Sequence, residues 1–147
     1  MKESDSIVII PTYNEKENIE NIIRAVFALP KSFHILIIDD GSPDGTASIV
    51  RGLMQDEFAD RLFMVERQGK LGLGTAYICG FKWALEYGYD FVFEMDADFS
   101  HNPEDLPRLY QACADDRPCN WHQAGYLANS SVNSSDCRAR RLVIRRR

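Results

Sequence analysis

The chain has 147 residues, 45% hydrophobic and 27% charged, which is enough for one compact domain but not for two. No apolar run approaches the roughly 20 residues of a membrane-spanning helix, and the N-terminus lacks the basic and apolar regions of a secretory signal. The net charge of -5 hides two parts: residues 1–116 carry 10 Lys and Arg against 21 Asp and Glu, whereas residues 117–147 carry seven Arg against Asp136 alone. The acidic first part disfavours nucleic acid as a partner.

In the first 116 residues, short apolar runs alternate with longer amphipathic ones. The short runs predict buried strands at 7–10, 35–38, 62–65 and 91–95, the first ended by Pro11. The longer runs predict helices at 17–29 and 46–55, a third through Ala76, Phe81, Ala84 and Leu85, and a fourth at 103–112. This alternation implies an α/β fold with a mostly parallel sheet and helices on both faces. Residues 117–147 show no such period.

The cysteines carry no metal or disulfide signature. They are Cys79, Cys113, Cys119 and Cys137, with no CxxC pair and no histidine at ligand spacing. We therefore expect reduced thiols in a cytoplasmic protein.

The strongest chemical signal is the acidic run Asp96-Ala97-Asp98 at the end of the fourth predicted strand. At a turn leaving the sheet, two carboxylates can bind one hard cation together with a diphosphate. The alternative is an ordinary loop whose acids cap the next helix. Ligands of parallel sheets bind beyond the carboxyl ends of the strands, which favours the metal site.

Polar residues also follow the first two strands. Asp40 can accept hydrogen bonds from a base or ribose, or belong to a turn in which Asp44 caps the next helix. Tyr13 can stack on a base whose polar edge Glu15 holds. Alternatively, Tyr13 covers the sheet and Glu15 favours the dipole of the following helix.

The glycine-rich segment 69–74 follows the third strand. It matches neither GxGxxG nor a Walker loop, so a dehydrogenase-type dinucleotide site is disfavoured. We expect it to let the backbone approach a ligand or the sheet closely, with Lys70 as a charge partner. His101 has no His or Cys at ligand spacing, and we expect a surface or helix-capping role for it.

Four segments occur in one order and spacing: IVIIPTYNEKENI, ILIIDDGSPDGT, KLGLGTAYICGF and MDADFSHNPEDLPRL. Together they resemble a family 2 glycosyltransferase of the GT-A fold, of the dolichol-phosphate (polyprenol monophosphate) mannosyltransferase type, over roughly residues 6 to 114. The resemblance implies that the guanine and ribose of GDP-mannose are held by Pro11, Tyr13, Glu15, Ile38 and Asp40. It also implies a diphosphate and Mg2+ or Mn2+ site made by Asp96, Ala97, Asp98 and Ser100, with Asp96 and Asp98 as metal ligands and Asp98 as the catalytic residue.

The resemblance also implies a reaction: inverting transfer of mannose from GDP-mannose to dolichyl or polyprenyl phosphate, with peripheral contact at the cytoplasmic membrane face. The acceptor phosphate is already an anion at neutral pH, so no strong general base is required. Two alternatives stay open. One is another sugar nucleotide, such as UDP-glucose; the other is a truncated nucleotide-binding module without activity.

The sequence departs from the family pattern after about residue 114. Family members continue with a Val-Ile-Gly-Ser/Thr-Arg signature, which this chain lacks. The segment PCNWHQ at 118–123 has codons that can be read one base later. The shifted codons can encode Leu, then Val or Ala, then Ile, then an obligatory Gly, then Thr and then Arg, which is the order of the missing signature. We therefore expect 1–116 to be the nucleotide-sugar part of a GT-A domain with an incomplete C-terminal half, and 117–147 to be a disordered or frameshifted tail. The alternative is a genuine terminus whose +6 charge meets anionic lipid.

Overall fold

The computed structural model describes residues 4–114 and 143–145 and confirms the predicted α/β fold. Its sheet has the order β3-β2-β1-β4-β5; β1 to β4 are parallel, and β5 is antiparallel to β4. The strands are β1 Ser6–Thr12, β2 His34–Asp39, β3 Leu62–Glu66, β4 Phe91–Glu94 and β5 Val143–Arg145. The helices are α1 Ile19–Phe27, α2 Thr46–Asp56, α3 Leu73–Glu86 and α4 Leu106–Ala114, with a 3-10 turn η1 at Pro103–Asp105.

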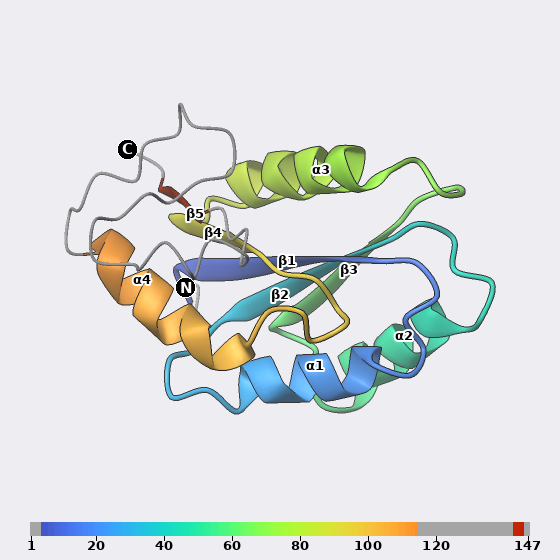
Figure 1. Ribbon diagram of the computed structural model, residues 1–147, viewed down its shortest axis with the longest axis horizontal. Coiled ribbons are helices and arrows are strands. Elements are labelled where there is room, and N and C mark those ends of the chain that lie inside the picture. Colours follow the sequence, from blue (N-terminus) through green and yellow to red (C-terminus); the bar gives the residue numbers. More distant parts are fainter. Residues whose placement is uncertain (1–3, 115–142, 146–147) are drawn as a thin grey trace.

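Helices cover both faces of the sheet, as expected (Figure 1). Val8 and Ile10 of β1 pack toward α1 and α2, while Ile7 and Ile9 pack toward α3 on the other face. All four side chains are fully buried. Because successive side chains of a strand point to opposite faces, a strand covered on both sides reads as a continuous apolar run. None of the helices in the described ranges is long and apolar enough to cross a membrane.

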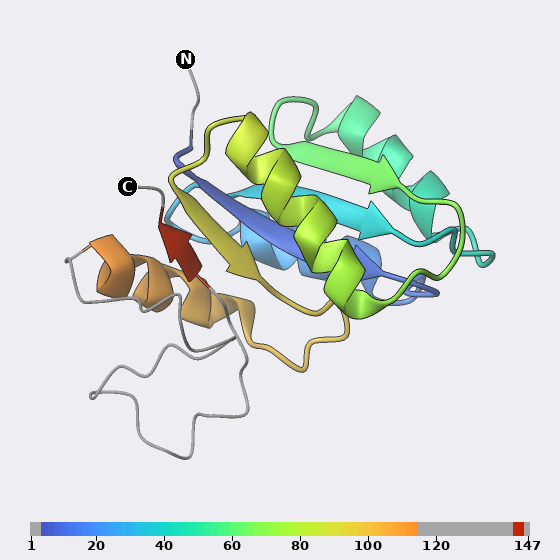
Figure 2. The same cartoon turned by 90° about the horizontal axis from the view of Figure 1, so that it is seen from above.

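Helix α3 packs across one face of the sheet (Figure 2) and contacts β1, β2 and β4. A Cβ placed on Gly80 would come within 2.7 Å of Cγ2 of Ile9, which is closer than two carbon atoms can pack. The absence of a side chain at Gly80 therefore sets how near α3 lies to β1.

The strand order reverses at β1, because β2 and then β3 lie on one side of it and β4 on the other. Ligands of open α/β sheets bind at such a point, beyond the carboxyl ends of the strands. The loops after β1, β2 and β4 all leave the sheet at this edge. The fold thus brings together the polar segments that the sequence placed after separate strands.

Pro11 does not end the first strand, contrary to the prediction. The strand continues to Thr12, which pairs with Asp39. The carbonyl of Ile9 accepts from Met95 N on the β4 side, and alternate residues of a strand face the same neighbour. Pro11 therefore faces the side on which pairing with β4 has already ended, where its missing N–H costs no ladder bond.

The expected tail falls largely outside the described residues. Only 143–145 are described, and these form β5 against β4, so this part of the tail has regular backbone pairing. The expectation of a disordered or frameshifted segment for the rest of 117–147 stays a prediction.

Candidate functional site

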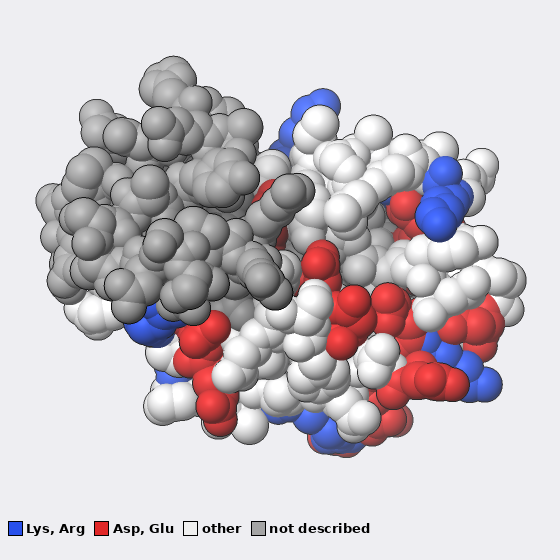
Figure 3. Space-filling view, in the orientation of Figure 1, with Lys and Arg blue, Asp and Glu red and all other residues white. Residues whose placement is uncertain are grey.

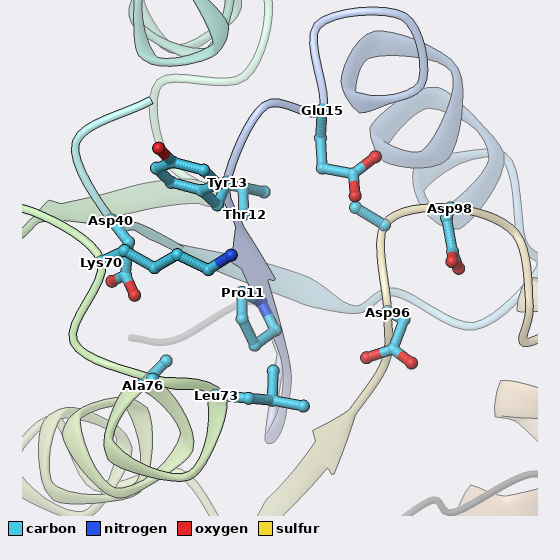
Figure 4. Close-up of a pocket in the computed structure, with 12 residues that line it drawn as sticks. Pro11, Thr12, Tyr13, Glu15, Asp40, Lys70, Leu73, Ala76, Asp96 and Asp98 are labelled. Carbon is cyan, nitrogen blue, oxygen red and sulfur yellow. The ribbon is translucent and has the colours of Figure 1, made fainter. Parts of the chain in front are cut away.

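A pocket of about 260 Å³ opens at the carboxyl edge of the sheet (Figure 4). Its lining comes from the ends of β1, β2 and β4 and from the start of α3. We call the residues after β1 and β2 with the loop 67–72 the β1–β2 side, and residues 96–101 the β4 side. The lining residues are Pro11, Thr12, Tyr13, Glu15, Asp40, Lys70, Gly72, Leu73, Ala76, Asp96, Ala97 and Asp98.

The loop after β1 is fastened to the loop after β2 by three consecutive backbone amides. Asn14 N donates to Ser42 Oγ at 3.0 Å, Glu15 N to Thr46 Oγ1 at 3.1 Å, and Lys16 N to an Asp44 oxygen at 3.1 Å. This accounts for the Ser, Asp and Thr of the DDGSPDGT segment: they satisfy the backbone of the loop that carries Tyr13 and Glu15.

Asp39 and Asp44 of that segment differ in role. Asp39 is buried and accepts from the hydroxyls of Thr12 at 2.8 Å and Ser42 at 2.7 Å, so it is structural. Asp44 accepts from the backbone N and hydroxyl of Thr46, the first residue of α2. The Thr46 hydroxyl bond is the main cause that lowers the pKa of Asp44. The N-cap residue of α2 is Gly45 rather than Asp44 as predicted, but Asp44, one residue earlier, still accepts from the first backbone amide of the helix.

Asp40 lines the pocket from within a buried ion pair. Arg67 donates to both of its oxygens, Nε at 2.6 Å and Nη2 at 2.9 Å, and Leu71 N donates at 3.3 Å. The side chains of Arg67 and Asp40 are only 10% and 8% exposed. A carboxylate has about four acceptor positions, so Asp40 keeps about one for a ligand.

Arg67 also organises the glycine segment. Its Nη1 donates to Thr75 Oγ1 at 2.9 Å, and its Nη2 donates to the Gly72 carbonyl at 3.3 Å. Gly41 has a φ of +68°, and a Cβ there would lie 3.0 Å from Gly69 N. A close backbone approach therefore occurs between the loops after β2 and β3 and depends on Gly41, whereas the approach of segment 69–74 to a ligand or the sheet stays a prediction.

Lys70 reaches from the glycine segment into the pocket beneath Tyr13 (Figure 4). Its ammonium lies 4.7 Å from the centre of the Tyr13 ring, within the range of a cation–π contact. Among the described residues that line the pocket, Lys70 is the one cation beside four carboxylates. The partner of Lys70 is thus an aromatic face rather than an acid.

On the β4 side, Asp96 and Asp98 leave the strand on one tight turn. Ser100 N donates to Asp98 Oδ1 at 3.0 Å, and Ser100 is the main cause that lowers the pKa of Asp98, which keeps this carboxylate ionised. Asp96 accepts from the Tyr77 hydroxyl at 3.0 Å. Its own backbone N donates to Nδ1 of His101 at 3.2 Å.

Two of the nine predicted nucleotide-sugar residues do not line the pocket. Ile38 is fully buried and packs in the cluster beneath α3, so its side chain is not available to a ligand. Ser100 lies outside the lining and instead bonds to the two acids. The structure does bring together the other seven: Pro11, Tyr13, Glu15, Asp40, Asp96, Ala97 and Asp98.

The expected surface or capping role of His101 is wrong. Its side chain is buried and holds the turn at Asp96, while Asn102 caps the following turn by accepting from Glu104 N. Sequence reasoning also missed Arg67 and Tyr77. Both lie in segments that the resemblance covers, but a lone arginine or tyrosine has no spacing that marks it as a partner of an acid.

Acidic side chains gather at the edge where the pocket opens, whereas the surface over α3 is mainly uncharged (Figure 3). An acidic pocket binds a nucleoside diphosphate more weakly when no cation is bound with it. The electrostatics of the site therefore fit a metal-bound anion better than an anion alone.

Comparison with known sequences identifies the family. Residues 7–133 match the family described as glycosyl transferase family 2. The chain belongs to glycosyl transferase family 2. The matched range extends past residue 116, and the boundary expected there stays a prediction.

Two bacterial relatives carry names that agree with the resemblance. A polyprenol monophosphomannose synthase of Mycolicibacterium smegmatis is 50% identical over 111 residues, which are 73% of this chain and 40% of the relative. An undecaprenyl-phosphate mannosyltransferase of Micrococcus luteus is 47% identical over 107 residues, 72% of this chain and 43% of the relative. The chain thus spans about two fifths of the length of these family 2 relatives.

Solved structures confirm the GT-A fold class. A mannosyltransferase from Pyrobaculum calidifontis, in complex with GDP-Man and Mn2+, has a TM-score of 0.55 and 28% identity, covering 64% of this chain and 27% of that one. TarS of S. aureus has a TM-score of 0.62 and 24% identity, covering 75% and 32%. The second likeness concerns the fold alone. The family match and the fold therefore agree.

Proposed function

We propose that this chain is the nucleotide-sugar part of an inverting mannosyltransferase that transfers mannose from GDP-mannose to dolichyl or polyprenyl phosphate. The observation that carries the proposal is the meeting of Tyr13, Glu15 and Asp40 with the Asp96 and Asp98 pair in one pocket. The two bacterial relatives, named as mannose-transferring enzymes, support the sugar and the lipid acceptor.

The residues of the β4 side fit a divalent ion, Mg2+ or Mn2+. Asp96 and Asp98 are oxygen ligands of the kind hard cations prefer. No group of three or more His, Cys, Asp or Glu suited to a metal occurs in the part of the chain that the structure describes. Two carboxylates leave most coordination positions open, which fits an ion that also binds a diphosphate. When bound, the ion would neutralise the charge that develops on departing GDP.

We assign the β1–β2 side to the nucleoside. Tyr13, a residue that is 38% exposed, offers an aromatic ring to the base. Glu15 offers a carboxylate for the polar edge of guanine, and Asp40 a remaining acceptor for the ribose. The fastened loops hold these groups in place before the ligand arrives, which lowers the entropy lost on binding. The contribution of the chain to the reaction is alignment of the donor, because an anionic acceptor needs no proton removed.

Peripheral membrane contact belongs to the proposal, because the acceptor is a lipid. A second candidate function is nucleotide binding without transfer. The observation that favours it is the pocket lining, which offers groups for a nucleoside and for a metal-bound diphosphate.

Thermal denaturation of the 147-residue chain tests the donor. A ligand that binds only the native state adds about 2.7 kcal/mol of stability at 100 times its Kd. With Mn2+ present, GDP and GDP-mannose should raise the melting temperature, whereas UDP and UDP-glucose should not. The reverse preference would establish the alternative donor. Transfer of radiolabelled mannose to polyprenyl phosphate then separates an enzyme from a binding module.

A further inference from the structure

Asp96 is held at three points by its own chain, whereas a metal ligand on an unrestrained turn would sample several rotamers. Oδ1 accepts from the Tyr77 hydroxyl at 3.0 Å, and Oδ2 lies 3.5 Å from Ser100 Oγ. The backbone N of Asp96 donates to the buried His101 ring. The Asp96 side chain nevertheless stays 40% exposed and faces the pocket, so these contacts orient it without enclosing it.

Of these contacts, only that with Tyr77 comes from another element of the fold. Tyr77 lies on α3, one helical turn before Gly80, whose missing side chain lets α3 approach β1 closely. Its ring stacks on Phe81 with centroids 6.4 Å apart and packs against the core beneath α3. The hydroxyl therefore approaches Asp96 from a packed helix rather than from a loop.

The Tyr77 hydroxyl donates to a carboxylate at 3.0 Å. A bond of this kind is charge-assisted and stronger than one between two neutral groups.

We propose that Tyr77 is a positioning residue of the divalent-metal site, because its hydroxyl fixes the Asp96 carboxylate so that the free lone pairs face the pocket. The proposal rests on the proposed function, since it concerns the same site. Partners behind a metal ligand orient it and raise its affinity, and their loss typically costs about 10–100-fold in metal binding. Tyr77 itself touches neither metal nor nucleotide in this assignment.

The test is the variant Tyr77→Phe in the 147-residue chain. Tyr89→Phe is the matched control. Tyr89 also packs in the cluster beneath α3, but its hydroxyl bonds at 2.8 Å to Nδ1 of His34, which is not a residue of the pocket lining. Mn2+ binding at saturating GDP is measured from the free-Mn2+ electron paramagnetic resonance signal. GDP binding in EDTA is measured by calorimetry.

We expect Tyr77→Phe to weaken Mn2+ binding by about 10-fold or more, while GDP affinity in EDTA changes less than about twofold and Tyr89→Phe matches wild type in both. The Tyr77 proposal is overturned if Tyr77→Phe binds Mn2+ like wild type, or if it weakens GDP binding in EDTA as much as Mn2+ binding. If wild type itself shows no binding of Mn2+ with GDP, the proposed metal-dependent function fails, and the positioning role fails with it.

Discussion

The two sides of the pocket are built from different kinds of contact. On the β1–β2 side, three backbone amides bond to side chains of the opposite loop, and a buried Arg67–Asp40 ion pair fixes the glycine segment. On the β4 side, the acids are more exposed and rest on a few contacts to one turn and one helix. The first arrangement makes a rigid surface, whereas the second leaves carboxylate oxygens free for a cation.

This difference implies that substitutions on the two sides should have separable effects. Changes on the β1–β2 side should lower the stability of the fold, whereas changes on the β4 side should lower metal-dependent binding and leave stability nearly intact. Four variants test this separation.

The largest effect is expected from Arg67→Ala. The substitution leaves the Asp40 carboxylate buried without its partner, and breaking one half of a buried pair costs about 3–5 kcal/mol. We expect this loss in the free energy of unfolding, measured by urea denaturation. Arg24→Ala is the control: Arg24 forms ion pairs on the surface with Glu20 and Glu57 and should matter far less. Equal losses would contradict the structural role of the buried pair.

Asp98→Ala should act on binding alone. Removing a direct metal ligand should cost more than the roughly 10–100-fold typical of an outer partner, so metal-dependent GDP binding should be lost in calorimetry with Mn2+. The free energy of unfolding should change by less than about 1 kcal/mol, because an exposed acid contributes little to stability. Asp90→Ala, at the opposite end of β4, is the control. Unchanged GDP affinity in Mn2+ would remove Asp98 from the metal site.

Gly80→Ala should disturb both sides through α3. The new methyl group would meet buried Ile9, and overpacking of this kind costs about 1–3 kcal/mol. Gly52→Ala in α2 is a matched control, since nothing lies within 4 Å of a Cβ there and alanine stabilises a helix by up to about 1 kcal/mol over glycine. We expect the melting temperature to fall in Gly80→Ala and to rise in Gly52→Ala. A rise in both variants would show that α3 can move outward freely.

The smallest effect is expected from Ser42→Ala. It removes one acceptor for Asn14 N and one donor to Asp39, and a net hydrogen bond is worth about 1 kcal/mol. Stability should fall by about that amount, with GDP affinity in EDTA weakened because the Tyr13 loop is less fixed. Ser48→Ala on the exposed face of α2 should change neither quantity. If Ser42→Ala binds GDP in EDTA as tightly as wild type, the loop does not need this bond.

The sequence was sufficient to predict the order of β1 to β4 and of the helices, because buried parallel strands read as unbroken apolar runs such as 7–10 and 35–38. It also predicted that acids lie at strand ends, and the structure gathers these acids at one pocket. The continuation of the first strand through Pro11 could not be foreseen. Whether a proline is tolerated in a strand depends on where the neighbouring strand stops pairing, and this is a tertiary property.

The side chains that bond to these acids could not be predicted from the sequence for a related reason. Arg67 meets Asp40 across 27 positions and Tyr77 meets Asp96 across 19, and no periodicity links such pairs. Ile38 shows the converse. The resemblance implied a ligand contact, but the alternation of a strand directs that side chain into the core beneath α3.

The central position of β1 has a consequence for the order of folding. Ile7 pairs with His34 on one side and with Val92 on the other, so the second partner emerges much later during synthesis. Contacts between near segments form before those that close long loops. The proposed nucleoside surface can therefore assemble with the first βαβ unit, whereas the proposed metal-binding turn must wait until β4 inserts beside β1.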